Sequence, residues 1–135
     1  MNEKELVKRA IQARKAAYAP YSKFRVGACL LSKNDKIYYG CNIENASYPA
    51  TNCAERTAFF RAVSEGEREF QKIAIVGGAE QIEDLCPPCG ICLQVMMEFC
   101  NPETFEIILG REDLQYEKYL LKELLPKGFG PGNLA

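Results

Sequence analysis

Apolar residues recur at three- and four-residue intervals in three segments of the chain, the spacing of amphipathic helices. Asn2 is followed three residues later by Glu5, the spacing of a capping box at a helix start. Asn52 and Glu55 repeat this pattern. We therefore expect helices over about residues 3–17, from residue 52 to near Gly66, and over about residues 89–99.

Strand patterns lie between these segments. Apolar and smaller residues alternate over residues 24–31, which predicts a strand with one well-buried face. Asn34 and Asp35 form a turn signal that predicts a hairpin with residues 37–42. The short apolar run 73–76 lies between helical patterns and predicts a strand parallel to a neighbour. Residues 105–109 predict a fourth strand, and residues 43–52 a loop.

This order of elements predicts one α/β domain over residues 1–135, with helices on both faces of a mixed sheet. A chain of 135 residues is long enough for one hydrophobic core and short for two. The apolar spacing over residues 114–125 fits either one helix or a strand followed by a helical turn, so periodicity leaves the tail open.

Composition narrows the class of partner. The chain carries 17 basic and 18 acidic residues, a net charge of -1, without the basic excess typical of nucleic-acid or anionic-membrane binding. No apolar run approaches the ~18 residues of a membrane span, and the N-terminus lacks the pattern of a signal peptide. We expect a cytoplasmic protein acting on a small molecule, with neither nucleic acid nor membrane as partner.

The chain has no histidine and seven cysteines. Catalytic triads that use imidazole and zinc sites with histidine ligands are therefore excluded. An odd number of cysteines without an export signal favours reduced thiols over a disulfide framework. Cys29, Cys41 and Cys100 lie in strand- or helix-like runs and are expected in or near the core.

Two predicted helix starts carry the remaining chemistry. Cys53 and the pair Cys89 and Cys92 fall in first helical turns, where free backbone N–H groups favour the thiolate form that binds metal. Three thiolates suit a zinc site that keeps one position open. Glu55, two residues after Cys53, is poorly placed as a ligand and well placed as a base. Cys86 is the alternative: as a fourth ligand it would close the site.

The spacing C-x-E…P-C-x-x-C is the cysteine version of the signature of zinc deaminases. Further blocks follow in one order over residues 24 to about 134, and together the chain resembles a short-form cytidine deaminase. The Asn-Ile-Glu-Asn block narrows the resemblance to the nucleoside branch. The blocks are FRVGA at 24–28, GCNIENASY at 40–48, NCAERTA at 52–58, PCG at 88–90, QVM at 94–96 and ELLP at 123–126.

This resemblance implies hydrolytic deamination of cytidine and deoxycytidine to uridine and deoxyuridine, with release of ammonia, in pyrimidine salvage. It implies one Zn²⁺ per subunit, held by Cys53, Cys89 and Cys92, with Glu55 moving the protons. The implied fold is a three-layer α-β-α sandwich around a mixed five-stranded sheet, with a strand near residues 116–120 followed by a short helix.

The resemblance also implies the substrate contacts. Phe24 would pack against the pyrimidine, Asn42 and Glu44 would hydrogen-bond the ribose hydroxyls, and Ala54 would line the substrate site. Related enzymes are homotetramers with sites completed by neighbouring chains. The residues implied as donors across such an interface are Tyr48 and Phe129.

Three thiolates and one Zn²⁺ carry a formal charge of -1, which weakens the metal as a Lewis acid. Arg56, next to Glu55, is the nearby cation expected to hydrogen-bond a cysteine sulfur and offset that charge. The position after the last ligand is commonly arginine in the family and is Leu93 here. Burial beside a pyrimidine would raise the pKa of Glu55 towards neutrality.

Two other functions remain open at this point. A deaminase of single-stranded nucleic acid would use the same zinc chemistry, although the net charge disfavours it. A noncatalytic zinc or dithiol module would use the cysteines without Glu55.

Overall fold

The computed structural model describes residues 1–134 and contains one five-stranded mixed sheet in the order β2-β1-β3-β4-β5. The β1 and β2 strands form the predicted hairpin, and β3 pairs antiparallel with β1 and parallel with β4. The parallel neighbour expected for the run 73–76 is thus confirmed. The strands are β1 (Arg25–Ser32), β2 (Ile37–Cys41), β3 (Phe70–Gly78), β4 (Glu106–Gly110) and β5 (Tyr116–Leu120).

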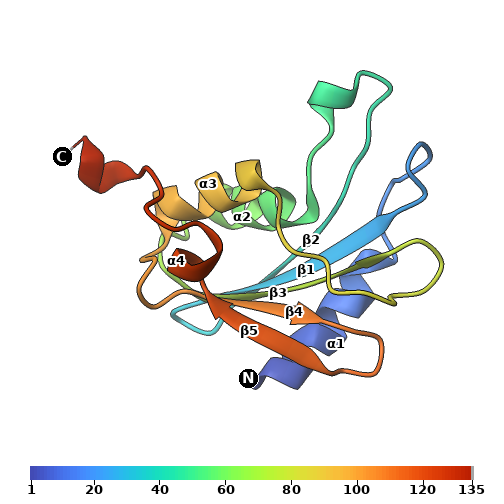
Figure 1. The fold of residues 1–135 in the computed structure, drawn as a ribbon, viewed down its shortest axis with the longest axis horizontal. Coiled ribbons are helices and arrows are strands. Elements are labelled where there is room, and N and C mark those ends of the chain that lie inside the picture. Colours follow the sequence, from blue (N-terminus) through green and yellow to red (C-terminus); the bar gives the residue numbers. More distant parts are fainter. Residues whose placement is uncertain (135) are drawn as a thin grey trace.

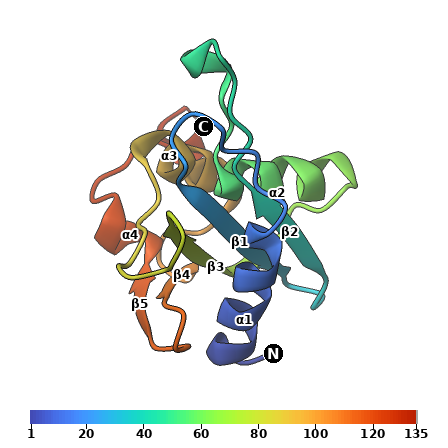
Figure 2. The same ribbon diagram turned by 90° about the vertical axis from the view of Figure 1, so that its right-hand side faces the viewer.

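Helices cover both faces of this sheet. The α1 helix (Glu3–Arg14) lies on one face, while α2 (Ala54–Ser64) and α3 (Gly90–Phe99) lie side by side on the other (Figures 1 and 2). The short α4 (Leu121–Leu124) follows β5 and packs near α3. Separate apolar clusters fill the two gaps between the layers. The three-layer α-β-α fold and the strand-then-helix tail are confirmed.

The β1 strand is buried on both faces, contrary to the single buried face expected from its alternation. Residues 28–32 are all buried because Leu30 packs under α2 and Cys29 and Leu31 pack against α1. The sequence pattern marked only one of these faces as well buried, because the alternate positions include Arg25 and Gly27. A strand between two helical layers is covered on both faces, so alternation was a poor guide to exposure.

The first helix ends at Arg14, three residues earlier than expected. Asn2 caps its start as predicted, accepting a hydrogen bond of 2.8 Å from the Glu5 backbone N–H. At its end, the Arg14 side chain donates to the Arg25 and Gly78 carbonyl oxygens. The chain then turns, and Tyr18 forms a bridge to Ile43. Tertiary contacts therefore decide this end.

The second helix starts one residue later than the capping-box pattern predicts. Cys53 is the N-cap, and Asn52 is occupied in a bridge to Ile43 and in a side-chain hydrogen bond of 3.1 Å to Thr57. Asn52 and Glu55 thus do not form a capping box. The helix ends before Gly66, whose φ of +97° is the left-handed conformation that glycine adopts easily.

A glycine in β2 brings this helix start against the sheet. A Cβ at Gly40 would lie 2.2 Å from the Ala54 carbonyl oxygen and 2.6 Å from the Ala58 backbone nitrogen. Only a residue without a side chain allows this approach. The N-terminus of α2, which carries Cys53, is therefore held tightly against the end of the hairpin.

No helix within residues 1–134 is long and apolar enough to cross a membrane.

Candidate active site

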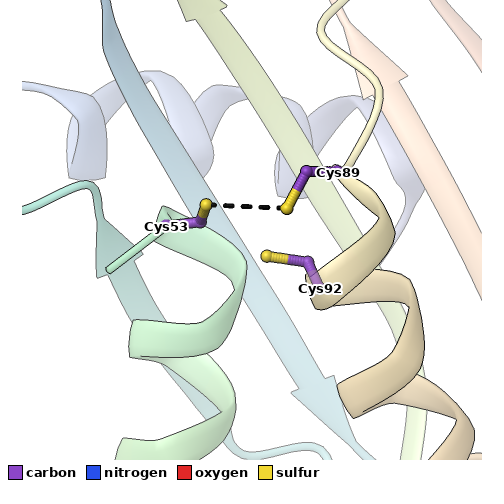
Figure 3. Close-up of side chains that lie close together, drawn as sticks. All are labelled: Cys53, Cys89 and Cys92. Carbon is purple, nitrogen blue, oxygen red and sulfur yellow. Dashed lines mark hydrogen bonds between the residues drawn. The ribbon is translucent and has the colours of Figure 1, made fainter. Parts of the chain in front are cut away.

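Three cysteine sulfurs meet between the N-termini of α2 and α3. Cys53 and Cys89 are the N-caps of the two helices, and Cys92 lies in the first turn of α3 (Figure 3). Their sulfur atoms all lie within 4.8 Å of one another, and the Cys53 and Cys89 sulfurs are 3.8 Å apart. These distances are far longer than a disulfide bond of about 2.05 Å.

This arrangement fits a metal ion. Sulfurs at about 2.3 Å from a tetrahedral Zn²⁺ lie roughly 3.8 Å from one another, close to the separation of the Cys53 and Cys89 sulfurs. Three sulfur donors leave one tetrahedral position for a small ligand. Cys53 and Cys89 occupy the N-cap positions of the two helices, where the positive end of each helix dipole favours a negatively charged or metal-bound group.

Arg56 supplies the positive side chain. Its Nη2 donates a hydrogen bond of 3.1 Å to the Cys53 sulfur. The hydrogen bond between Cys92 and Cys53, together with the Arg56 contact, lowers the pKa of the Cys53 thiol. Within residues 1–134, the Arg56 Nε is the buried side-chain nitrogen or oxygen that lacks a hydrogen-bond partner.

Cys86 lies close to this group and is not part of it. Among the described residues, the candidate metal-binding group comprises only the three cysteines above. The Cys86 sulfur packs instead on β3, 2.8 Å from where a Cβ of Gly77 would stand. Burial raises the pKa of the Cys86 thiol to about 12, which keeps it protonated. The structure does not place a fourth thiol in the open position.

Glu55 is a buried carboxyl beside the three thiols. Its side chain is 4% exposed, and it occupies the first turn of α2. Burial raises its pKa to about 7. A carboxyl group of this pKa can both bind and release a proton near neutral pH, which is the requirement for a general acid and base.

Leu93 fills the position where the family commonly has arginine. Its side chain is 7% exposed and belongs to the apolar cluster beneath α2 and α3. The residue thus contributes to the core and brings no charge to the thiols.

Asn42 and Glu44 lie next to the metal-binding end of α2, because Ile43 between them pairs with Asn52. The Asn42 amide donates to the Phe24 carbonyl oxygen and accepts from the Val26 N–H, both at 2.8 Å. The Phe24 ring is 42% exposed and approaches the same side of Gly77 as Cys86. The Ile43–Asn52 pairing thus brings Asn42 and Glu44 towards the start of α2, and Phe24 lies against the space beside Gly77 that Cys86 also borders.

The other expected substrate residues differ in placement. Ala54 is fully buried at the start of α2, directly after Cys53. Tyr48 is 70% exposed in a short 3-10 turn that projects from the domain, and Phe129 is 57% exposed near the C-terminus. The single chain does not bring Tyr48 or Phe129 to the three thiols.

Two residues at the site were missed by sequence reasoning. Ser22 hydrogen-bonds both Glu44 and the Phe24 backbone. Gly77 provides the space in which Phe24 and Cys86 come together. Neither residue type indicates a binding site by itself, so no signal in the sequence pointed to either residue.

Comparisons with known proteins agree with this geometry. Residues 1–107 match the family model described as the cytidine and deoxycytidylate deaminase zinc-binding region. A cytidine deaminase of Halalkalibacterium halodurans is 49% identical over 96% of this chain and 95% of its own length. One from Sporosarcina psychrophila is 45% identical over 100% of this chain and 96% of its own.

A solved structure shows the same fold. The 1.6 Å crystal structure of cytidine deaminase from Burkholderia pseudomallei matches with a TM-score of 0.87 and 44% identity, covering 96% of this chain and 100% of that one. With a family model spanning most of the sequence and relatives aligned over nearly their full lengths, the chain belongs to the cytidine and deoxycytidylate deaminase family.

Proposed function

We propose that this protein is a zinc-dependent hydrolase that converts cytidine and deoxycytidine to uridine and deoxyuridine and releases ammonia. One observation carries the proposal: a buried carboxyl, Glu55, stands beside three convergent thiols that leave a coordination position free. A noncatalytic zinc module has no need for a buried carboxyl whose pKa is raised to about 7.

Cys53, Cys89 and Cys92 would hold one Zn²⁺ per chain, as the sulfur separations support. When bound, the metal supplies Lewis-acid activation of a water molecule. Arg56 offsets the formal charge of the three thiolates and holds the Cys53 sulfur in place.

Glu55 moves the protons of the reaction. Its carboxylate takes a proton from the attacking water and delivers it to N3 of the pyrimidine as the water oxygen bonds to C4. It then takes the proton of the resulting C4 hydroxyl and transfers it to the amino nitrogen at C4, so that the C4–N bond breaks, the C4=O bond of uridine forms and ammonia departs. A carboxyl with a pKa near 7 can complete both transfers without a second titrating residue.

The nucleoside is held by residues bordering the thiols. Phe24 offers an exposed ring to the pyrimidine, and Ala54, whose side chain is buried directly after Cys53, is the further contact that the resemblance implies. Asn42 and Glu44 direct polar atoms to the ribose, with Asn42 retaining one amide N–H and Glu44 retaining acceptor capacity beyond their internal hydrogen bonds.

We further propose that the enzyme is a homotetramer. Large aromatic side chains stay exposed on the isolated chain, including Tyr18, Tyr21 and Tyr48, and the rings of Tyr21 and Tyr48 contact each other edge to face. Exposed apolar groups gathered in this way are typical of protein interfaces. Tyr48 and Phe129 would reach the active site of a neighbouring chain. Light scattering coupled to size-exclusion chromatography tests the subunit number.

Pyrimidine salvage in the cytoplasm is the proposed setting. All seven cysteines are free, and the three that hold the metal must stay reduced to do so. A reducing compartment meets this requirement.

The decisive experiment follows the ultraviolet change as cytidine becomes uridine, with and without a chelator. We expect turnover of cytidine and deoxycytidine that a chelator abolishes and added Zn²⁺ restores. A parallel assay with a cytosine-containing single-stranded oligonucleotide separates the rival deaminase class. Turnover of the oligonucleotide in place of the nucleosides would contradict the proposal, as would purification without stoichiometric zinc.

A further inference from the structure

The segment containing Phe24 is held against the domain by a small set of hydrogen bonds. Residues 21–24 are exposed, and Lys23 adopts a left-handed backbone with φ of 60°. A non-glycine residue in this conformation needs support from its surroundings. The support comes from Glu44: its Oε1 accepts from the Tyr21 N–H at 2.9 Å and the Ser22 N–H at 3.1 Å.

Ser22 connects this carboxylate to Phe24. Its hydroxyl donates to the second oxygen of Glu44 and accepts a hydrogen bond of 3.0 Å from the Phe24 N–H. The carbonyl oxygen of Phe24 is held separately, because it accepts a hydrogen bond from the side-chain amide of Asn42. The serine hydroxyl is therefore the direct link between Glu44 and the Phe24 backbone.

We propose that Ser22 is a positioning residue of the nucleoside site, which sets the pyrimidine-facing ring of Phe24 and the ribose-facing carboxylate of Glu44 at a fixed separation. This inference rests on the proposed function, because the effect of Ser22 on binding is measured through the turnover of cytidine. Its physical basis is that a bound nucleoside has a rigid distance between base and sugar, so two contacts help only when they match that distance.

The hydrogen-bond capacity of Glu44 adds a consequence. An ionised carboxylate offers about four acceptor positions, and Tyr21 and the two Ser22 donors occupy three of them. One position remains for the sugar. Because Oε1 already accepts from two backbone N–H groups, the free position lies on Oε2, beside the Ser22 hydroxyl.

The hydroxyl also acts on the charge of Glu44. The hydrogen bond from the Ser22 side chain lowers the pKa of Glu44, with further contributions from the Ser22 and Tyr21 N–H groups and the positive charge of Lys23. A carboxylate that stays ionised remains an acceptor for the sugar hydroxyl.

The test compares Ser22→Ala with Ser22→Thr, which keeps the hydroxyl. We expect Ser22→Ala to raise KM for cytidine about tenfold, with kcat within about twofold, because the missing hydroxyl loosens binding and leaves the thiols and Glu55 intact. Ser22→Thr should restore most of the affinity. Ser64→Ala is the matched control, since its hydroxyl donates to a backbone carbonyl on the exposed end of α2.

A second readout does not depend on catalysis. Carbon-detected titration of the Glu44 carboxyl should show a higher pKa in Ser22→Ala than in the wild type, and an unchanged pKa in Ser64→Ala. A double-mutant cycle with Glu44→Gln should show that the two changes are not additive in KM, as expected of residues in contact.

Separate results decide the two proposals. A wild-type protein without cytidine turnover would overturn the proposed function, while the Glu44 titration would still decide the Ser22 contact. An active wild type combined with an unchanged KM in Ser22→Ala would overturn the role of Ser22, as would an unchanged Glu44 pKa. An equal fall in kcat and zinc content would also overturn it, because that pattern indicates a general structural defect.

Discussion

The two halves of the site are built in opposite ways. The thiol cluster depends on two helix starts: Cys53 and Cys89 occupy equivalent N-cap positions, and Cys92 follows Cys89 within one turn. The proposed nucleoside side depends on Ser22, Asn42 and Glu44, which join exposed segments through side-chain hydrogen bonds.

This difference teaches how each half can fail. Local backbone geometry places the thiols, and the packed helix starts leave them little freedom. The segment that carries Phe24 has few buried apolar contacts and is positioned by polar groups. Changes at the thiols should therefore abolish chemistry outright, while changes on the other side should reduce binding or stability by degrees.

The largest effect is expected from Cys53→Ala. The variant should lose both the metal and the activity, because two thiols hold zinc far more weakly than three. Metal analysis by mass spectrometry and the cytidine assay measure the two losses. Cys86→Ser is the matched control and should retain one zinc per chain. Loss of zinc in this control would make Cys86 a ligand and would invalidate the separation drawn between Cys86 and the three thiols.

Glu55→Gln should keep the zinc and the fold but lose kcat by about a thousandfold, since an amide cannot exchange protons as a general acid and base does. Stopped assays with high enzyme concentration measure the residual rate, and metal analysis verifies the site. Substantial turnover in this variant would remove Glu55 from the mechanism.

Asn42→Ala should affect the nucleoside side alone. Its amide makes two hydrogen bonds of 2.8 Å and is 9% exposed, so its loss should lower the free energy of unfolding by about 2 kcal/mol. Urea denaturation measures this change. Asn45→Ala, at an exposed position with one local hydrogen bond, should cost much less. Equal costs for the two variants would show that Asn42 does not hold the Phe24 segment.

The smallest effect concerns a contact remote from both halves. The hydrogen bond from Lys72 at 2.8 Å lowers the pKa of Glu3 below its ordinary value. The stabilisation is therefore present above the unfolded-state pKa, near 4.5, and is lost as pH falls through the lower folded-state pKa.

Replacing Glu3 with Gln should reduce the free energy of unfolding at neutral pH by about 1 kcal/mol, and the difference from wild type should vanish in acid. Parallel urea titrations of both proteins measure it. Metal release in acid affects the two alike and cancels in the difference. A constant difference down to the acid end would show that the pair contributes nothing through charge.

The chemistry of the thiol cluster was predictable because it is local. Cysteine spacing at helix starts is written in adjacent residues, and the absence of histidine restricts the ligands to sulfur and carboxylate. The two-residue spacing from Cys53 likewise indicated that Glu55 is placed to act as a base and not as a metal ligand. The turn signal between residues 24–31 and 37–42 predicted the β1–β2 hairpin. The position of the run 73–76 between two helical segments predicted that β3 has a parallel neighbour.

Other features needed the tertiary structure. Asn52 has the sequence of a helix cap, but its pairing with Ile43 moves the cap to Cys53. The first helix stops at Arg14, and the chain beyond it turns so that Tyr18 pairs with the segment after β2, a contact that the apolar spacing of residues 3–17 does not reveal.

The sequence by itself determined the class of fold and singled out the three candidate metal ligands and the proposed acid–base residue, since backbone periodicity and short spacings encode them. Only the tertiary structure decided that Cys86 stands apart from the three thiols, and that Ser22 joins Glu44 to Phe24. Ser22 and Glu44 lie 22 positions apart, and the place of Cys86 depends on its packing against Gly77 of β3. No local pattern specifies which side chains meet in these ways.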